Sequence, residues 1–169
     1  MTRRLAAIAL CCCFLAVTAG CLGGGVNQEA VARDHTYDWQ TPADATINIT
    51  GTTYYAVYTV QGNETLEVYE RDEIGSEYPV SVAAVQFRYP NGTVVNASKF
   101  TVEQRGSRTA IVPPADGKIA YTATTAPKNF GTPILSDGSY EVILPGNMEI
   151  SLPLFGVISP GGYTVSRQD

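Results

Sequence analysis

The 169-residue sequence predicts an all-β protein built as an antiparallel β-sandwich, immunoglobulin-like in the loose architectural sense. Apolar and polar residues alternate with period two in several runs after residue 44, which is typical of half-buried strands. Turn-forming residues separate these runs at a spacing of roughly ten residues. No stretch beyond the N-terminal segment carries a helical apolar stripe over three turns. We therefore expect one sandwich domain over residues 43–169.

The expected strands are rich in β-branched and aromatic residues. A hairpin is predicted at Asn91-Gly92, because both residues tolerate positive φ between two apolar runs. Further turn chemistry lies at residues 62–63, 105–107, 113–117 and 137–138. Beyond residue 144, proline and glycine interrupt the apolar runs. The final residues, 163–169, indicate a strand that either closes the sheet or continues into further protein. The alternating runs lie at residues 54–60, 66–69, 85–89, 99–103, 118–124 and 140–144.

Residues 1–20 have the organisation of an export signal. Arg3 and Arg4 precede an uncharged apolar run from Leu5 to Ala19, and small residues follow it. The run holds about 15 residues, whereas a membrane-spanning helix needs roughly 20. The arginine pair fits both a general secretory signal and a twin-arginine signal, so the export route stays open.

The segment Thr18-Ala19-Gly20-Cys21 resembles the lipobox of prokaryotic lipoproteins. This resemblance implies that the signal is removed before Cys21 and that lipid is attached to the thiol of Cys21. It also implies an exported protein anchored to the outer face of the cell membrane. A single acyl chain binds a membrane only marginally, so we expect a two-chain modification.

Removal of the signal changes both the cysteine content and the charge. Cys11, Cys12 and Cys13 would leave with it, so the mature domain could form no internal disulfide. Loss of Arg3 and Arg4 leaves 9 of the 11 basic residues, whereas all 16 acidic residues remain. The net charge of the mature chain would therefore be 9 − 16 = −7. This charge argues against nucleic acid as a partner and against electrostatic adhesion to anionic lipids. Lipid on Cys21 would then be the link to the membrane.

Residues 21–42 are expected to form a flexible tether. They begin with the glycines of the Leu22-Gly23-Gly24-Gly25 stretch, continue with mostly polar residues and contain few large apolar side chains. The single histidine, His35, falls inside this segment, and Trp39 marks where order is expected to begin.

The sequence offers no recognisable catalytic motif. A hydrolytic triad or a zinc site needs histidine or free cysteine placed by the fold, and His35 and Cys21 are committed elsewhere. No glycine-rich loop stands between a strand and a helix to hold phosphate. We therefore expect neither an enzyme nor a cofactor.

An acidic cluster lies between residues 64 and 77, and Glu70, Asp72 and Glu73 are its weak candidates for a calcium loop. Such loops usually alternate Asp, Asn and Gly, whereas this segment is rich in Glu. We interpret it as a solvated acidic edge, with no metal site expected. The cluster consists of Glu64, Glu67, Glu70, Asp72, Glu73 and Glu77.

Four Asn-x-Ser/Thr sequons are candidate N-glycosylation sites, and chance occurrence in a chain rich in Asn and Thr explains them equally well. Asn63, Asn91 and Asn96 lie at predicted turns, where a transferase could reach them. Asn48 lies in a predicted strand and is the weakest candidate.

Taken together, the lipobox, the following glycines, the acidic balance and the Thr-rich strands resemble surface lipoproteins of halophilic archaea. The final stretch, from residues 139–142 to residues 155–162, resembles a domain-of-unknown-function family from those organisms. This resemblance implies no particular activity.

Two classes of function remain. The first is a non-catalytic envelope or binding module anchored outside the cell. The second is an extracellular solute receptor or carboxylate-dependent hydrolase whose site forms only in the folded structure. The sequence does not name a protein or small-molecule ligand for either class.

Overall fold

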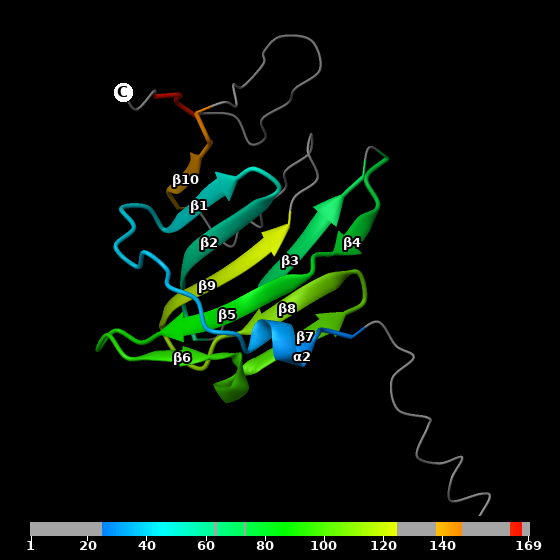
Figure 1. Ribbon diagram of the computed structural model, residues 1–169, viewed down its shortest axis with the longest axis vertical. Coiled ribbons are helices and arrows are strands. Elements are labelled where there is room, and N and C mark those ends of the chain that lie inside the picture. The colour runs from blue at the N-terminus through cyan, green and yellow to red at the C-terminus, as the bar shows by residue number, and fades with distance from the viewer. Residues whose placement is uncertain (1–24, 63, 73, 125–137, 147–162, 167–169) are drawn as a thin grey trace, which may run out of the picture.

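The computed structural model describes residues 25–62, 64–72, 74–124, 138–146 and 163–166 (Figure 1). Two β-sheets pack against each other, and helix is limited to α2 (Gln28–Val31) and the 3-10 turn η1 (Ala97–Lys99) in these residues. The predicted all-β sandwich is therefore confirmed. The strands are β1 (Ala45–Thr50), β2 (Thr53–Val60), β3 (Leu66–Arg71), β4 (Glu77–Pro79), β5 (Val82–Arg88), β6 (Val94–Asn96), β7 (Thr101–Arg105), β8 (Arg108–Val112), β9 (Gly117–Thr124) and β10 (Tyr140–Ile143).

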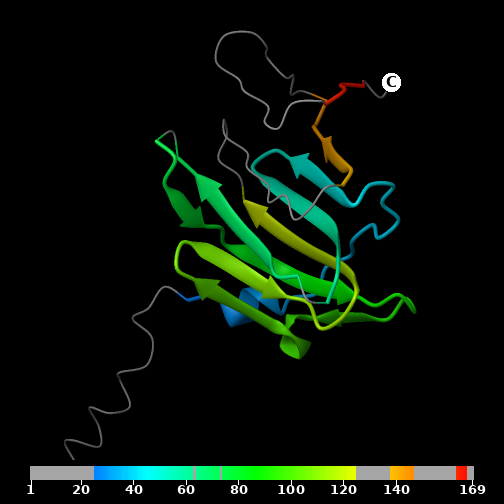
Figure 2. The same ribbon diagram turned by 180° about the vertical axis from the view of Figure 1, so that it is seen from behind.

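The larger sheet has the strand order β10-β1-β2-β9-β5-β6, and the smaller has the order β4-β3-β8-β7 (Figures 1 and 2). All recorded pairs of neighbouring strands are antiparallel except β1 with β10. The start of that parallel pair is fixed by Asp44, whose Oδ2 accepts from the backbone N–H and the hydroxyl of Ser139, both at 2.9 Å. These contacts join the first and the last described strands of the larger sheet.

The main core lies between the two sheets and follows the alternation in the sequence. In β2, the set Tyr54, Ala56, Tyr58 and Val60 of the predicted alternation points inward and is buried. Burying a large apolar side chain contributes about 1.5–3 kcal/mol, so these positions dominate the stability of the fold. The largest fully buried side chains are Tyr54, Tyr58, Tyr121, Phe87, Ile47, Leu66, Ile111, Ile119, Val31, Val57, Val68 and Val85.

Tyrosine rings fill the centre of this core. The Tyr121 ring stacks nearly parallel on Tyr58, with centroids 6.2 Å apart, and meets Tyr54 edge-on at 6.0 Å. Desolvation raises the pKa of Tyr54 to about 12 and holds the pKa of Tyr121 well above its ordinary value. Both phenols therefore stay neutral in the folded protein at physiological pH.

The predicted Asn91-Gly92 hairpin joins β5 to β6. The Tyr89 carbonyl accepts from the Gly92 N–H at 2.9 Å, and the Asn91 side chain accepts from the Thr93 N–H at 2.9 Å. Gly92 has a φ of 89°, a left-handed conformation that glycine adopts without a Cβ clash. The hairpin prediction is therefore confirmed.

Two connections cross between the sheets at one end of the sandwich. The β2–β3 and β8–β9 connections pack together, and the Gly62 N–H donates to Asp116 Oδ1 at 2.8 Å. A Cβ at Gly62 would lie 2.9 Å from the backbone of Ala115, which is too close for any side chain. Glycine is thus required here by the close approach of two backbones.

Some strand predictions need correction. All six predicted strands are present, but β8 was not predicted because Thr109, Ala110 and Ile111 are consecutive buried residues without alternation. Residues 163–166 form no strand, contrary to expectation. The interrupted apolar runs at residues 148–158 lie outside the described residues.

Candidate functional site

The N-terminal segment packs on the sandwich over residues 26–42, which we call the strap. The sequence predicted a flexible tether over residues 21–42, and this prediction is wrong for residues 26–42. The segment begins with α2, where the Asn27 side chain accepts from the Ala30 N–H at 3.0 Å as an N-cap. Val31 is completely buried in the inter-sheet core, and Gln28 Nε2 donates to the Val102 carbonyl of β7. The strap thus enters the fold beside β5 and β7 (Figure 1).

Beyond α2, the strap crosses the outer face of the larger sheet. Tyr37 is buried there and packs with Val57, Ala84 and Ala120 in a second, smaller core. Its hydroxyl donates to the Ala84 carbonyl at 2.9 Å and lies 2.9 Å from the Thr122 hydroxyl. Burial raises the pKa of Tyr37 to about 12, so the hydroxyl remains a donor.

The Tyr37 contact stabilises an irregular point of β5. The pairing of β5 with β9 shifts register between Ala83 and Gln86, and Ala84 adopts a φ of 50°. A non-glycine residue with positive φ persists only where its surroundings hold it. Gln86 Nε2 also donates to the His35 carbonyl at 2.8 Å, so the strap holds both sides of this bulge.

The end of the strap is fixed by Lys118 of β9. Its ammonium donates to the Trp39 carbonyl at 3.0 Å and to the Thr41 hydroxyl at 2.9 Å. The Trp39 ring meets Tyr37 edge-on, with centroids 5.9 Å apart. The sequence predicted that order begins at Trp39, whereas the ordered part of the strap already includes α2 (Gln28–Val31).

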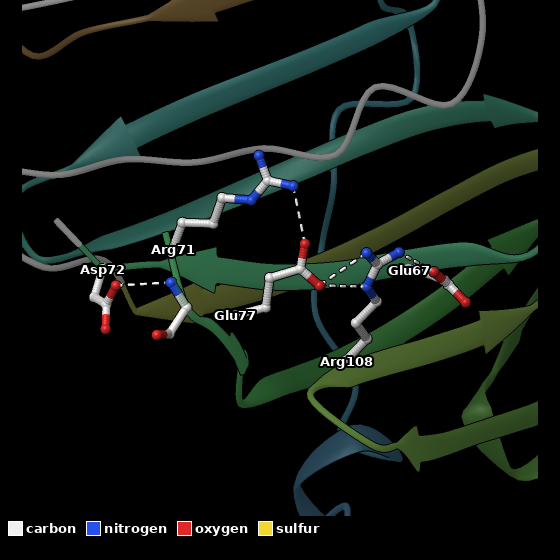
Figure 3. A network of polar contacts seen from close by, with 6 residues as sticks. Glu67, Arg71, Asp72, Glu77 and Arg108 are labelled. Carbon is white, nitrogen blue, oxygen red and sulfur yellow. Dashed lines mark hydrogen bonds and ion pairs between the residues drawn. The ribbon is translucent and has the colours of Figure 1, made fainter. Parts of the chain in front are cut away.

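Two members of the acidic cluster, Glu67 and Glu77, take part in an ion-pair network on the outer face of the smaller sheet (Figure 3). Arg108 of β8 lies between two carboxylates, with Nη1 2.6 Å from Glu67 Oε2 and Nη2 2.8 Å from Glu77 Oε2. Arg71 Nη2 contacts the other oxygen of Glu77 at 2.9 Å. The Tyr69 ring lies under this network, 4.5 Å from the Arg108 guanidinium carbon. Glu67 and Glu77 thus keep 37 % and 20 % of their side-chain surface exposed on this acidic edge, and both are ion-paired there with Arg108.

Asp72 shapes the turn between β3 and β4. Its Oδ1 accepts from the N–H groups of Ile74 and Ser76 at 3.0 and 2.8 Å, and its Oδ2 accepts from the Tyr78 hydroxyl at 3.2 Å. These bonds hold the pKa of Asp72 below its ordinary value, with the Ser76 backbone bond as the largest cause. The carboxylate is thus already engaged by the turn.

The weak calcium candidates do not converge in the described part of the chain. Glu70 is half-buried in β3, Asp72 is in the turn, and Glu73 lies outside the described residues. Within that part, no three or more His, Cys, Asp or Glu side chains are grouped closely enough to hold a metal ion.

The sequons occupy different settings. Asn91 is exposed at the tip of the β5–β6 hairpin, whereas Asn48 is half-buried in β1. Asn96 caps η1, with its Oδ1 accepting from the Ser98 N–H at 3.2 Å and the Ser98 hydroxyl at 2.6 Å. Asn63 lies outside the described residues, as do Cys21 and the signal segment.

The chain matches a protein family over most of its length. Residues 41–169 match the family described as "Family of unknown function (DUF5803)". The chain belongs to this family. The match supports the predicted domain-of-unknown-function relationship. Neither the curated proteins nor the solved structures contain a match to the chain.

The DUF5803 match covers every described strand and begins at the end of the strap. The residues that sequence reasoning missed are mainly in the strap. The alternation of Tyr37 and Trp39 with exposed Asp38 and Gln40 is a short period-two signal that could have identified them. Helices long and apolar enough to cross a membrane are absent from the described residues.

Proposed function

We propose that the chain is an exported lipoprotein that is anchored through lipid on Cys21 and displays a non-catalytic binding domain outside the cell. The observation that carries this proposal is the lipobox segment Thr18-Ala19-Gly20-Cys21 behind a basic and apolar leader. A β-sandwich that needs no disulfide is compatible with this arrangement, since every cysteine precedes residue 22.

The packed strap defines how such a domain would sit relative to its anchor. Val26 packs against the main core, and five peptide steps separate it from Cys21. A fully extended chain covers at most ~3.6 Å per residue, so the anchor would lie within roughly 18 Å of the sandwich. The domain would therefore be held close to the membrane, with its α2 end nearest to it.

A binding role is favoured over catalysis because several carboxylates are already engaged in ion pairs or hydrogen bonds. Glu67 and Glu77 are engaged by Arg108, and Asp72 is engaged by its own turn. Groups already paired in this way are suited to stabilising a display surface. The His35 ring packs against Tyr37 with centroids 4.5 Å apart, so it also has a structural contact.

Cell fractionation of a Cys21→Ser variant tests the anchor. We expect the variant to move from the membrane fraction to the medium, or to remain unprocessed. Cys13→Ser is the matched control, because it changes a cysteine inside the apolar run and should leave anchoring intact. A Cys21→Ser protein that is still processed and still membrane-bound would refute the proposal.

We also propose Asn91 as the most accessible glycan acceptor among the described sequons. It is exposed at a hairpin tip, and its side chain stabilises only its own turn. Intact-mass analysis of protein from the native host should show a glycan that is lost in Asn91→Gln and retained in Asn48→Gln. A native mass equal to that of the processed and lipidated chain without a glycan would contradict this.

A further inference from the structure

One end of the sandwich is formed by α2, β7 and the segment of β6 and η1. Figures 1 and 2 place these elements together at one end of the domain, with β10 and the β3–β4 hairpin at the other. The contacts agree, because α2 packs against β5, and η1 contacts β5, β6 and β7. We call the surface made by residues 26–34 and 94–105 the anchor end.

The length of chain before α2 brings the anchor end close to a membrane. Val26 packs against the main core and follows Cys21 by five peptide steps. A chain extended at ~3.6 Å per residue then leaves at most roughly 18 Å between the lipid on Cys21 and the sandwich. This gap is about the length of one average strand. The anchor end therefore reaches the lipid surface before the opposite end does.

The anchor end carries no net charge, although the chain as a whole is acidic. The mature chain would have 9 basic and 16 acidic residues, so the part outside the anchor end carries 6 − 13 = −7. Anionic headgroups repel that part of the chain, whereas they do not repel the neutral end. The charged residues of the anchor end are the basic Arg33, Lys99 and Arg105 and the acidic Glu29, Asp34 and Glu103.

Two cations of the anchor end are available to contact phosphate. The side chains of Arg33 and Lys99 are exposed and form no ion pair or hydrogen bond with another described residue. Arg105 differs, because its Nε lies 2.7 Å from Glu103 Oε1. A basic side chain near an anionic lipid surface is attracted to it. Arg33 and Lys99 can therefore contact headgroups without breaking an existing pair.

An open groove of about 300 Å³ lies beside Lys99. Val94 and Val95 of β6 line it together with Lys99, and Asp34 of the strap also lines it. Val94 is 44 % exposed, which is unusual for a large apolar side chain in a strand. An exposed apolar side chain beside a cation suits the boundary between headgroups and acyl chains. The groove thus adds apolar contact to the charge of the anchor end.

We propose that the anchor end rests on the lipid headgroups of the membrane that holds the chain. Arg33 and Lys99 contact phosphates, and Val94 meets the edge of the acyl layer. The inference deepens the proposed function, because it names the surface that faces the membrane, and it rests on that function for the anchor at Cys21. The sandwich then points its acidic remainder, with β10 and the β3–β4 hairpin, away from the lipid.

The test is NMR of the full ¹⁵N-labelled chain in nanodiscs of phosphatidylcholine and phosphatidylglycerol that contain a gadolinium-chelating lipid. The full chain keeps its apolar leader, which holds it in the disc whether or not Cys21 carries lipid. A negative result here would therefore leave the Cys21 fractionation unaffected, and the reverse also holds.

We expect paramagnetic broadening at the amides of residues 28–34 and 94–101, and little at residues 74–78 and 138–142 of the opposite end. Equal broadening at the two ends would mean that the domain tumbles freely on its tether, and would overturn the proposal. Stronger broadening at the opposite end, or no broadening at either end, would overturn it as well.

Two valine substitutions form a matched pair that locates the contact. Val94 in β6 and Val142 in β10 lie on the two edge strands of the larger sheet, with exposed fractions of 44 % and 45 %. Val94→Asp should lower the broadening at residues 94–101 severalfold, because it places a carboxylate against phosphates, whereas Val142→Asp should leave it unchanged. Lys99→Gln should also lower it, through the loss of one cation. Retained spectral dispersion will show that each variant is folded, and equal effects of the two valine substitutions would contradict the assignment.

Discussion

The two apolar cores of this molecule differ in how the sequence encodes them. The core between the sheets is made by strands whose inward residues alternate, such as Tyr54, Ala56 and Tyr58 of β2. The core under the strap is made where Tyr37 meets Val57 and Ala120, which come from two strands far along the chain. The first core follows from local periodicity, whereas the second requires a contact between distant segments.

This difference shows that a mostly polar N-terminal segment can cover apolar residues on the outer face of a sheet. Val57 sits on the outer face of β2 and would be exposed without the strap, yet it is buried. The strap also satisfies the Ala84 carbonyl at the bulge of β5. A few well-placed side chains are enough, because one buried tyrosine provides both apolar area and a hydrogen bond.

The largest expected effect comes from the core between the sheets. Phe87 is completely buried and contacts the rings of Tyr89 and Phe100, with centroids at 4.8 and 6.2 Å. Phe87→Ala should lower the free energy of unfolding by about 3–5 kcal/mol, because it removes buried area and leaves a cavity. Urea denaturation followed by circular dichroism measures this. A loss below about 1 kcal/mol would mean that Phe87 is not in the core.

A smaller effect is expected from the core under the strap. Tyr37→Phe keeps the ring but leaves the buried Ala84 carbonyl without its donor, which should cost about 1–3 kcal/mol. Hydrogen exchange in β5 around residues 84–86 should accelerate more than exchange in β3. Tyr163→Phe, at an exposed position, is the control and should change stability by less than about 0.5 kcal/mol. Equal effects of the two substitutions would argue against a docked strap.

Acidification should weaken both ends of the sandwich. Asp44 accepts from Ser139, Asp72 accepts from Ser76, and Glu77 contacts Arg71 and Arg108; each contact lowers the pKa of its carboxyl. A lowered folded-state pKa gives stability that is present above the ordinary pKa and is lost as pH falls through the folded value. The Tm should therefore decrease once the pH is lowered below the ordinary pKa values, which are 4.5 for Glu77 and 3.8 for the aspartates. A Tm that is constant from about pH 5 to about pH 2 would contradict these assignments.

The smallest effect separates members of the acidic cluster. Asp72→Ala should lower the Tm, because it removes the acceptor for Ile74 and Ser76 in the β3–β4 turn. Glu70→Gln, in the same cluster, should lower it less, because Glu70 stands outside the ion-pair network of Figure 3. Differential scanning calorimetry of both variants decides this. The ranking is wrong if Glu70→Gln has the larger effect.

The fold class was predictable because each long strand carries its own periodicity. The Asn91-Gly92 hairpin was also predictable, since turn chemistry is local. The sequence did not predict β8, because both of its faces are covered and it has no alternation. The short strands β4 and β6 contain too few residues to show any pattern.

The candidate site was less predictable than the fold, because it depends on pairing between distant segments. The residues of the acidic cluster were identified, but their partner Arg108 is 41 positions from Glu67 and could not be assigned to it. Likewise, Thr46 and Glu141 become neighbours only through the parallel pairing of β1 with β10. Local periodicity contains no information on either contact.

The most direct test of the central claim uses Trp39, the single tryptophan of the chain, which lies in the strap. Trp39 fluorescence reports the strap, and far-UV circular dichroism reports the sheets, so one urea titration compares the two. The account predicts that both signals change in one coincident transition, because the strap is part of the cooperative fold. A Trp39 emission that is already solvent-like without urea, and that does not change as the sheets unfold, would contradict it.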